Sequence, residues 1–172
     1  VASVVYFENY KIPEGLKIND SKKMTKLQRE DAYKILTTND RIFYGVGLAS
    51  VEEIDSLNIL KASHLAVERA IKNLPREIEA FIMDGIRKPE LNIPAFTLKK
   101  GDSKSYNIAA ASIIAKVTRD KIMEELDVEF PQYGWSRNSG YGTKLHQQAL
   151  SIHGITKHHR RSYKPIKLIL GT

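Results

Sequence analysis

The sequence predicts an α/β protein in which helices flank a mixed β-sheet. Short segments rich in β-branched and aromatic residues alternate with longer segments whose apolar residues recur at helical spacing. Such alternation is typical of layered α/β domains. We expect a single domain over residues 1–172, because a chain of 172 residues is too short for two comfortable domains.

The expected elements follow from local patterns. Strands are expected at residues 1–7, 41–48, 78–83 and 95–98, and helices at 25–36, 51–74, 105–130 and 144–153. Thr25 is placed to cap the first helix, and the second helix is expected to break near Leu57 and Asn58. A stretch rich in glycine, serine and aromatic residues predicts a loop at 131–143.

The charge of the chain favours a polyanionic partner. Lysine and arginine outnumber aspartate and glutamate 27 to 20, which gives a net charge of +7 and a pI of about 9.5. Nucleic acid or an anionic membrane surface would suit this balance, although solubility alone also explains it. The chain has no cysteine, which excludes disulfides and thiolate metal sites, and no apolar run suited to membrane insertion or export. We expect a cytoplasmic protein.

Asp84 and Asp102 are the candidate catalytic and metal-binding residues. Asp84 follows the apolar strand at 78–83 and precedes Gly85, so its carboxylate should emerge at the rim of the sheet. Asp102 lies in a basic turn directly before a helix, whose first N–H groups favour anions. Alone, each has an ordinary explanation, as a turn aspartate or a helix cap. Together, two carboxylates among lysines suit Mg²⁺ or Mn²⁺ and a phosphate ester.

Two other aspartates receive structural interpretations. Asp20 could serve the same metal centre, but a cap for the following helix is favoured over a metal role. Lys22 and Lys23, which follow it, are better candidates for phosphate contacts. Asp120 is expected to form an ion pair on the long helix.

Candidate nucleic-acid contacts also lie near the C-terminal end. Tyr141 stands between two glycines, which suits a ring offered to a sugar or base, while anchoring of the fold is the alternative. Residues 158–162 form a basic patch that could grip phosphates, and a solvated cationic surface explains it almost as well. Its histidines lack the spacing of a zinc site. The sequence has neither a serine-hydrolase elbow nor a phosphate-binding loop.

Several motifs together strongly resemble one family over essentially the whole chain. In order, they are Asp20-Ser21-Lys22-Lys23, Gly47-Leu48-Ala49-Ser50 with Ile54-Asp55, Asn58-Ile59-Leu60-Lys61-Ala62, Asp84-Gly85, Lys100-Gly101-Asp102, the helical stretch Ala109 to Asp120, Gly140-Tyr141-Gly142-Thr143 and His159-Arg160-Arg161-Ser162. This set resembles ribonuclease HII.

The resemblance implies a ribonuclease H-like mixed sheet flanked by helices, with a C-terminal helical extension. It implies cleavage of the RNA strand of RNA/DNA hybrids, and cleavage 5′ to ribonucleotides embedded in duplex DNA, leaving 5′-phosphate and 3′-hydroxyl ends. In that family four carboxylates hold two Mg²⁺ or Mn²⁺ ions, and Asp84 and Asp102 match two of them. The tyrosine matched by Tyr141 packs on the sugar beside the ribonucleotide. The residues expected to bind substrate are Ser21, Lys22, Asn58, Tyr141, Arg160, Arg161 and Ser162.

The sequence departs from the family pattern at its start. The family's first strand carries Asp-Glu followed by Gly-Arg-Gly, and this chain opens instead on a strand that would follow it. The Asp-Glu pair supplies the other two metal ligands, so we expect the polypeptide as given to be inactive or nearly so. Loss of that strand would also expose a sheet edge that invites association. A truncated form of an active enzyme is the favoured explanation.

The main alternative is a non-catalytic nucleic-acid-binding protein derived from this fold. Such a binder should hold hybrid duplex without divalent ions, with an affinity that falls steeply as salt rises. A phosphoesterase for small substrates fits the charge poorly. We expect a monomer when the chain is intact, and find no clear motif for a sliding-clamp partner.

Overall fold

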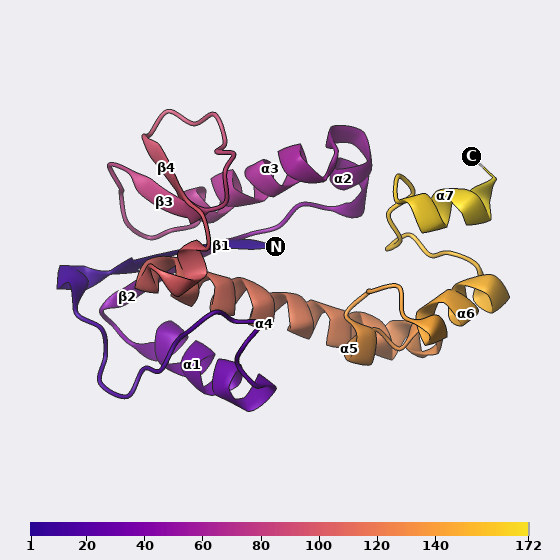
Figure 1. Ribbon diagram of the computed structural model, residues 1–172, viewed down its shortest axis with the longest axis horizontal. Helices are drawn as coiled ribbons and strands as arrows, with labels where there is room; N and C mark the ends of the chain where they lie inside the picture. Colours follow the sequence, from indigo (N-terminus) through magenta and orange to yellow (C-terminus); the bar gives the residue numbers. More distant parts are fainter. Residues whose placement is uncertain (172) are drawn as a thin grey trace. The chain divides into compact units, whose positions relative to one another are not determined.

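The computed structural model describes residues 1–171, which divide into two compact units. The first unit comprises Val1–Ala49 and Ser63–Val117, and the second comprises Ser50–Ala62 and the chain from Thr118 onward. Figure 1 labels the elements of both. The first unit contains β1 (Ala2–Phe7), α1 (Lys26–Thr38), β2 (Ile42–Gly47), most of α3 (Ile59–Lys72), β3 (Phe81–Asp84), β4 (Ala95–Leu98) and the first half of α4 (Tyr106–Glu129). This mixture of strands and helices confirms the expected α/β class.

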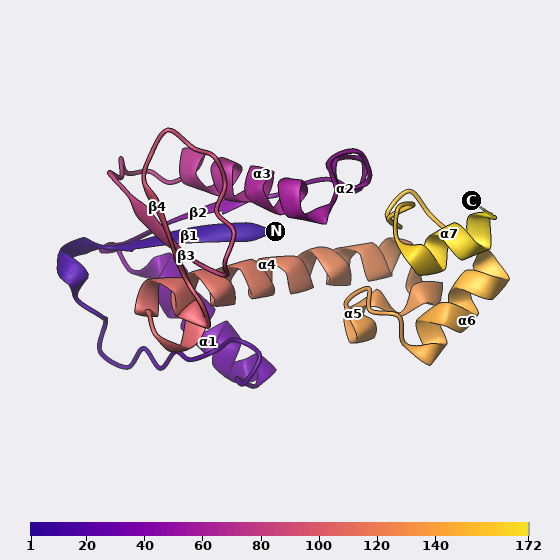
Figure 2. The ribbon, with the colours of Figure 1, turned by 45° about the horizontal axis from the view of Figure 1, so that its top comes forward.

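The four strands form two separate two-stranded sheets, whereas one mixed sheet was expected. β1 pairs antiparallel with β2, with Ala2 opposite Gly47, and β3 pairs parallel with β4, with Asp84 opposite Leu98. Figure 2 shows both pairs in the first unit. β3 is also shorter than the expected strand at 78–83, because its partner β4 has four residues. No described strand joins β1 to β3.

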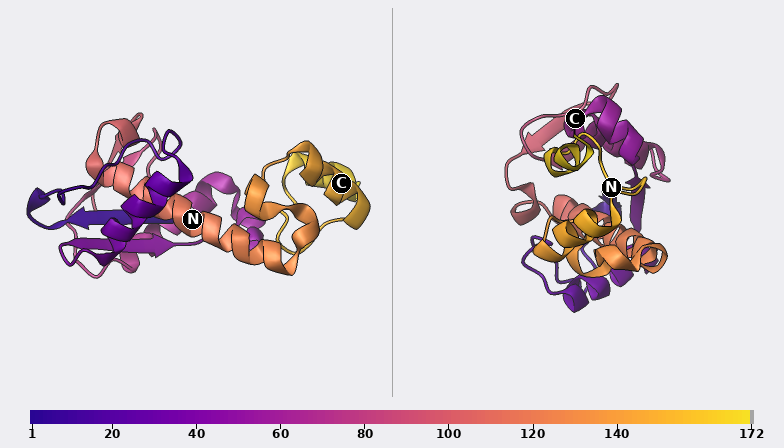
Figure 3. Two further views of the ribbon diagram at one scale, coloured as in Figure 1. Left: turned by 90° about the horizontal axis from the view of Figure 1, so that it is seen from below. Right: turned by 90° about the vertical axis from the view of Figure 1, so that its right-hand side faces the viewer.

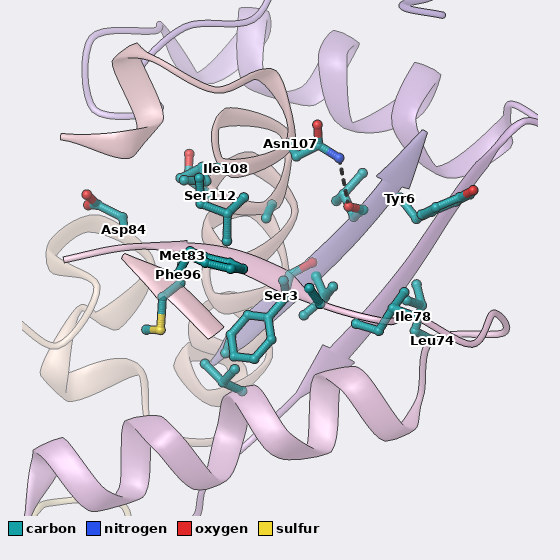
Figure 4. A pocket seen from close by; sticks show the side chains of 18 of the residues that line it. Ser3, Tyr6, Leu74, Ile78, Met83, Asp84, Phe96, Asn107, Ile108 and Ser112 are labelled. Carbon is teal, nitrogen blue, oxygen red and sulfur yellow. Dashed lines mark hydrogen bonds between the residues drawn. The ribbon is translucent and has the colours of Figure 1, made fainter. Parts of the chain in front are cut away.

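A cavity of about 790 Å³ lies between the two sheets. It is lined by β1, by residues 77–84, and by α4 residues that include Asn107 and Ile108 (Figure 4). The Glu8 N–H donates to Arg41 O, so the even-numbered residues of this segment direct their backbone groups toward β2. Because backbone groups alternate in direction along a strand, those of Ser3, Val5 and Phe7 point to the edge of β1 away from β2. Asn107 Nδ2 donates to Val5 O there at 3.2 Å.

β3 presents its free edge in the same way. The N–H groups of Phe81 and Gly85 donate to Pro94 O and Leu98 O, so the odd-numbered residues of β3 face β4. By alternation Ile82 and Asp84 direct their backbone groups away from β4. An exposed sheet edge was expected from the departure from the family pattern, whereas the strand patterns alone did not show that β1 and β3 would each have one.

The core of the first unit is aliphatic and depends on close approach of backbone to backbone. Val5, Phe7, Leu36, Ile113 and Ile114 are among its buried residues. Glycines let β2 lie against α3: a Cβ added at Gly47 would lie 2.0 Å from Ala66 O, and one at Gly45 would lie 2.0 Å from Ala70 O.

Local capping signals define the helix starts. Thr25 Oγ1 accepts from Gln28 N–H while Gln28 Oε1 accepts from Thr25 N–H, so the predicted cap of α1 is confirmed. The predicted break near Leu57 is confirmed as well, because Asn58 has a φ of 71° between two helices. Among the described residues, none of the helices combines the length and the apolar character needed to cross a lipid bilayer.

The second unit is helical and has an aromatic core. It contains α2 (Val51–Leu57), the second half of α4, α5 (Trp135–Asn138), α6 (Lys144–His153) and α7 (Lys164–Leu170), drawn in orange and yellow from α5 onward in Figure 3. α6 has the predicted bounds. The loop expected at 131–143 is only partly a loop, because it includes a 3₁₀ turn at Pro131–Tyr133 and α5. α7 was not predicted, since seven residues carry little periodicity. Tyr133 and Trp135 stack with centroids 5.0 Å apart.

Candidate active site and nucleic-acid-binding residues

Asp84 ends β3 and lies at the rim of the cavity described above (Figure 4). Its side chain is exposed, and its Oδ1 accepts a hydrogen bond of 2.8 Å from Gly101 N–H. The bond uses one carboxylate oxygen and leaves Oδ2 for a further ligand. The expected position of Asp84 at the end of a strand is therefore confirmed.

The turn at residues 99–105 brings the backbone just before Asp102 against Asp84. Lys100 adopts a left-handed conformation with φ 55°, and Gly101, the residue after it, is buried. A Cβ at Gly101 would lie 2.5 Å from Ile108 Cδ1 and 3.4 Å from Asp84 Cα, so only glycine fits this approach without a shift. Ser105 N–H donates to Gly101 O at 2.8 Å, which ties the turn to the start of α4. Asp102 thus directly follows the residue that is bonded to Asp84.

A hard divalent cation is the ligand expected for Asp84 and Asp102. Mg²⁺ commonly uses one or two carboxylates together with water and substrate phosphate oxygens, rather than an all-protein cage. Asp84 and Asp102 come from two elements joined by the Gly101 hydrogen bond, with the exposed Lys99 and Lys100 in the same turn. Within residues 1–171, no cluster of three or more His, Cys, Asp or Glu is placed to hold a metal. A metal site built on Asp84 and Asp102 stays a prediction.

The turn before α1 is organised by Asp20, but not as a helix cap. Asp20 Oδ1 accepts from Lys22 N–H at 3.0 Å, and Asp20 O accepts from Lys23 N–H at 2.9 Å. Thr25 caps the helix instead. Ser21 is buried, and its carbonyl accepts from Arg29 Nη1 at 3.0 Å, so it offers little surface to a substrate. Lys22 and Lys23 are exposed, as phosphate contacts require.

Asn58 has a structural task in the second unit. Its Oδ1 accepts from Leu60 N–H at 3.0 Å and from Lys61 N–H at 3.2 Å, which caps the start of α3. Asn58 makes this cap with a φ of 71°, which is uncommon for a residue other than glycine. Its expected contact with substrate stays a prediction.

Asp55 holds the basic segment at residues 160–162 and was not among the expected site residues. Its Oδ2 accepts from Arg161 N–H at 2.8 Å, and its Oδ1 accepts from Ser162 N–H at 2.9 Å and Ser162 Oγ at 2.5 Å. Burial alone would raise the pKa of Asp55, but these hydrogen bonds and the charge of Arg160 lower it below its usual value. Asp55 belongs to the motif Ile54-Asp55, but the sequence did not show that it would bind the backbone of Arg161 and Ser162.

The segment at residues 160–162 that Asp55 holds carries two positive charges and one hydroxyl group. The Arg160 guanidinium lies 4.9 Å from the centroid of the Tyr163 ring, a cation–π contact that orients it. Arg161 and Ser162 are exposed, although the Ser162 hydroxyl is already engaged by Asp55. The arginines are therefore the groups of this segment that remain available to phosphates.

Tyr141 is presented on a short loop and is 71% exposed. Its N–H donates to Asn138 O at 2.8 Å, and its carbonyl accepts from Thr143 N–H at 2.8 Å and from His146 Nδ1 at 2.9 Å. Nearby, Asp120 accepts from Ser139 Oγ at 3.4 Å. The ring is free to meet a ligand while the backbone is fixed.

His159 corrects the interpretation of the tail patch. It is buried at 6% exposure, with its ring 5.0 Å from that of Tyr133, so it does not grip phosphates. Burial, with His146 and His158 nearby, lowers the pKa of His159 to about 4. His146 is buried beside it and was not singled out from the sequence, because a lone histidine in a helix gives no local signal.

A family model described as Ribonuclease HII matches residues 1–166. The chain belongs to the ribonuclease HII family. Among relatives named ribonuclease HII, one from Wolbachia pipientis subsp. Culex pipiens is 46% identical over 98% of this chain and 83% of its own length. One from Magnetococcus marinus is 49% identical over 99% of this chain and 79% of its own length. One from Ruegeria pomeroyi is 50% identical over 99% of this chain and 71% of its own length.

A solved structure confirms the fold expected of a ribonuclease HII. The crystal structure of the ribonuclease H2 from Pyrococcus horikoshii superimposes with a TM-score of 0.68 at 23% identity. The match covers 97% of this chain and 95% of the other. The ribonuclease H-like α/β architecture with a helical C-terminal part is therefore shared.

Proposed function

We propose that this member of the ribonuclease HII family is an endonuclease for RNA within duplexes. It cuts the RNA strand of RNA/DNA hybrids and cuts 5′ to a ribonucleotide embedded in duplex DNA, leaving 5′-phosphate and 3′-hydroxyl ends. The observation that supports this most directly is the hydrogen bond from Gly101 N–H to Asp84 Oδ1, because it ties the residue before Asp102 to the carboxylate of Asp84.

In the first unit, Asp84 and Asp102 hold divalent metal, Mg²⁺ or Mn²⁺. The metal, when bound, supplies Lewis-acid catalysis and a nucleophilic water. Because Gly101 N–H engages Oδ1 of Asp84, Oδ2 would be the oxygen available to hold the cation. Lys99 and Lys100, both exposed, draw the phosphate backbone toward this turn.

In the second unit, the exposed Tyr141 ring packs on the sugar beside the ribonucleotide. The 2′-hydroxyl is the group by which a protein distinguishes RNA from DNA. Arg160 and Arg161 bind backbone phosphates and position the duplex, without reading its sequence. Lys22 and Asn58 are further proposed contacts, and Ser21 would need its surroundings to open.

The polypeptide of residues 1–172 brings two of the four carboxylates that the family resemblance implies. We therefore expect little or no cleavage by this polypeptide alone, because two cations about 4 Å apart need more ligands than two carboxylates. The cavity between the free edges of β1 and β3 supports this view, since Asp84 lies at its rim. A strand carrying Asp-Glu in that cavity would bring its carboxylates toward Asp84.

The decisive experiment is incision of a labelled DNA duplex that contains one ribonucleotide, with Mg²⁺ or Mn²⁺. The polypeptide is compared with a form extended by an upstream Asp-Glu/Gly-Arg-Gly strand. We expect the extended form to cut 5′ to the ribonucleotide, and Asp84→Asn or Asp102→Asn to slow it by at least about 100-fold, because a metal contributes several kcal/mol to the transition state.

Asp31→Asn is the matched control, because Asp31 is exposed on α1 and its replacement removes the same charge. It should cut like the unsubstituted protein. If neither form cuts, while both bind hybrid duplex without metal and lose affinity steeply with salt, the non-catalytic binding protein replaces the nuclease.

A further inference from the structure

We propose that His146 is a positioning residue for Tyr141, and that His159 and Trp135 fix the tautomer in which it does so. The three side chains form a buried hydrogen-bond relay in the second unit. The proposal rests on the proposed function only where Tyr141 meets the substrate. The placement of the loop itself is independent of that function.

The bond from His146 to the loop assigns its proton. His146 is 5% exposed, and its Nδ1 lies 2.9 Å from Tyr141 O. A carbonyl oxygen only accepts, so Nδ1 carries hydrogen and donates. Nε2 of the neutral ring is then an acceptor.

Two donors converge on that acceptor. Trp135 Nε1, which can only donate, lies 3.3 Å from His146 Nε2. His159 Nε2 lies 3.2 Å from the same atom and must therefore also donate. The proton on His159 is thus on Nε2, and its Nδ1 is an acceptor.

The far end of the relay agrees with this assignment. Thr156 N–H donates to His159 Nδ1 at 3.0 Å, and Thr156 Oγ1 lies 3.0 Å from the same nitrogen. Thr156 Oγ1 accepts from His158 N–H at 3.1 Å, so its own hydrogen is free to point at Nδ1. Each ring nitrogen thus acts either as donor or as acceptor, and the two donors at His146 Nε2 and at His159 Nδ1 share the one lone pair of that nitrogen. The relay joins the turn at 156–159 to the loop that carries Tyr141.

The loop needs such an anchor. Tyr141 is flanked by Gly140 and Gly142, and Gly140 has a φ of 77°, so the backbone itself restrains little. Gln147 Nε2 also donates to the loop, to Gly142 O at 2.9 Å, but that bond is exposed to water. A hydrogen bond from a buried ring is shielded from competition by water and restrains the carbonyl more strongly.

The charge state near neutral pH keeps the relay intact. Because burial lowers the pKa of His159 to about 4, its Nδ1 stays free to accept from Thr156. Protonation there would place a hydrogen against the Thr156 N–H donor. The packing of the ring and the hydrogen-bond geometry thus agree on a neutral His159.

Two isosteric substitutions test the positioning role. His146→Asn places its amide nitrogen near the site of Nδ1 and keeps the donor to Tyr141 O, whereas His146→Gln places it near Nε2 and loses that donor. His153→Gln, an exposed histidine on the same helix, is the matched control.

The first readout is amide hydrogen exchange at Tyr141 and Thr143, whose N–H groups form the bonds within the loop. We expect exchange about tenfold faster in His146→Gln, and near the unsubstituted rate in His146→Asn and His153→Gln. Unchanged exchange in His146→Gln would overturn the positioning role.

The second readout is the ratio of affinities for duplex with and without an embedded ribonucleotide, measured without divalent metal. A lower ratio in His146→Gln, restored in His146→Asn, supports the full proposal. If amide exchange in His146→Gln is faster but the affinity ratio is unchanged, the positioning role of His146 is supported. That result would also show that Tyr141 does not recognise the ribonucleotide, which refutes that part of the proposed function.

Thr156→Val tests the relay if the substitutions at His146 prevent folding, which loss of cooperative melting would reveal. Valine keeps the shape of threonine and removes the hydroxyl that points at His159 Nδ1. We expect about threefold faster exchange at Tyr141. An unchanged exchange rate would show that the hydrogen bond from His146 to Tyr141 does not depend on the contact between Thr156 and His159.

Discussion

The two units hold their exposed functional groups in opposite ways. In the first unit, Asp84 and Asp102 are placed by backbone: a strand end, a buried glycine and an aliphatic core in which α3 lies against two glycines of β2. In the second unit, Tyr141 is placed by polar and titratable side chains within an aromatic core. The stability of the first unit should therefore be sensitive to side-chain volume added at its glycines. The stability of the second unit should be sensitive to the loss of side-chain hydrogen bonds and to acid.

The largest expected effect is that of Gly47→Ala on stability. The new Cβ would lie 2.0 Å from Ala66 O and 2.5 Å from Ala70 N, and because these are backbone atoms the helix must move. Overpacking of this kind costs about 3 kcal/mol of unfolding free energy. Urea unfolding measures the change.

Gly142→Ala is the control from the second unit. Its Cβ would meet Gln147 Nε2 at an ordinary 3.6 Å, so a loss below about 0.5 kcal/mol is expected. Equal losses for the two substitutions would show that close backbone approach does not distinguish the first unit.

The sequence predicted the elements well where the signal is local. The capping box at Thr25, the break at Asn58 and the bounds of α6 depend on residues within a few positions of one another. The pairing of strands is not local. An exposed sheet edge was expected only from the family resemblance, because the patterns of β1 and β3 do not show that each has a free edge beside a cavity.

The candidate site divides in the same way. Asp84 could be predicted from a strand that ends in Asp-Gly, but its bond to Gly101 spans 17 residues and needs the fold. His159 was grouped with the arginines beside it because the sequence shows a run of cations. It is buried among Tyr133, Trp135 and His146, which all lie at least 13 residues earlier.

The next effect in size is the response of the second unit to acid. The pKa of His159 is about 4 in the fold against 6.5 as its ordinary value, so the unfolded chain binds more protons between these pH values. The stability that depends on the neutral ring is complete above pH 6.5 and is lost as pH falls toward 4. We expect a loss of about 2 kcal/mol over this window.

Trp135 gives a local measurement, because it is the only tryptophan and its indole contacts His146. Urea unfolding followed by its fluorescence at pH 7 and pH 4.5 should show the loss, and His159→Gln should remove most of the pH dependence. Amide exchange in β2 serves as the reference for the first unit. If β2 responds to acid as strongly as Trp135, the proposed contrast between the units is wrong.

The smallest expected effect comes from Asp55→Asn, which weakens the hold on the segment at 160–162. The carboxylate accepts from Arg161 N–H, Ser162 N–H and Ser162 Oγ, and an amide would keep only part of this set. A loss of about 1 kcal/mol is expected at pH 7, since bonds to a partly exposed charge are screened. Because the pKa of Asp55 is lowered, this contribution is present above its ordinary pKa of 3.8 and disappears as pH falls below it.

Glu125→Gln, an exposed substitution on α4, removes the same charge without these bonds and should change stability less. The measurement is again unfolding followed by Trp135 fluorescence, now with the salt dependence of duplex binding beside it. A freed segment should spread Arg160 and Arg161 over more conformations, which weakens phosphate contacts modestly and lowers the slope of affinity against salt. If Asp55→Asn matches Glu125→Gln in both measurements, other contacts hold the arginines, and side-chain hydrogen bonding governs the Tyr141 loop but not the whole second unit.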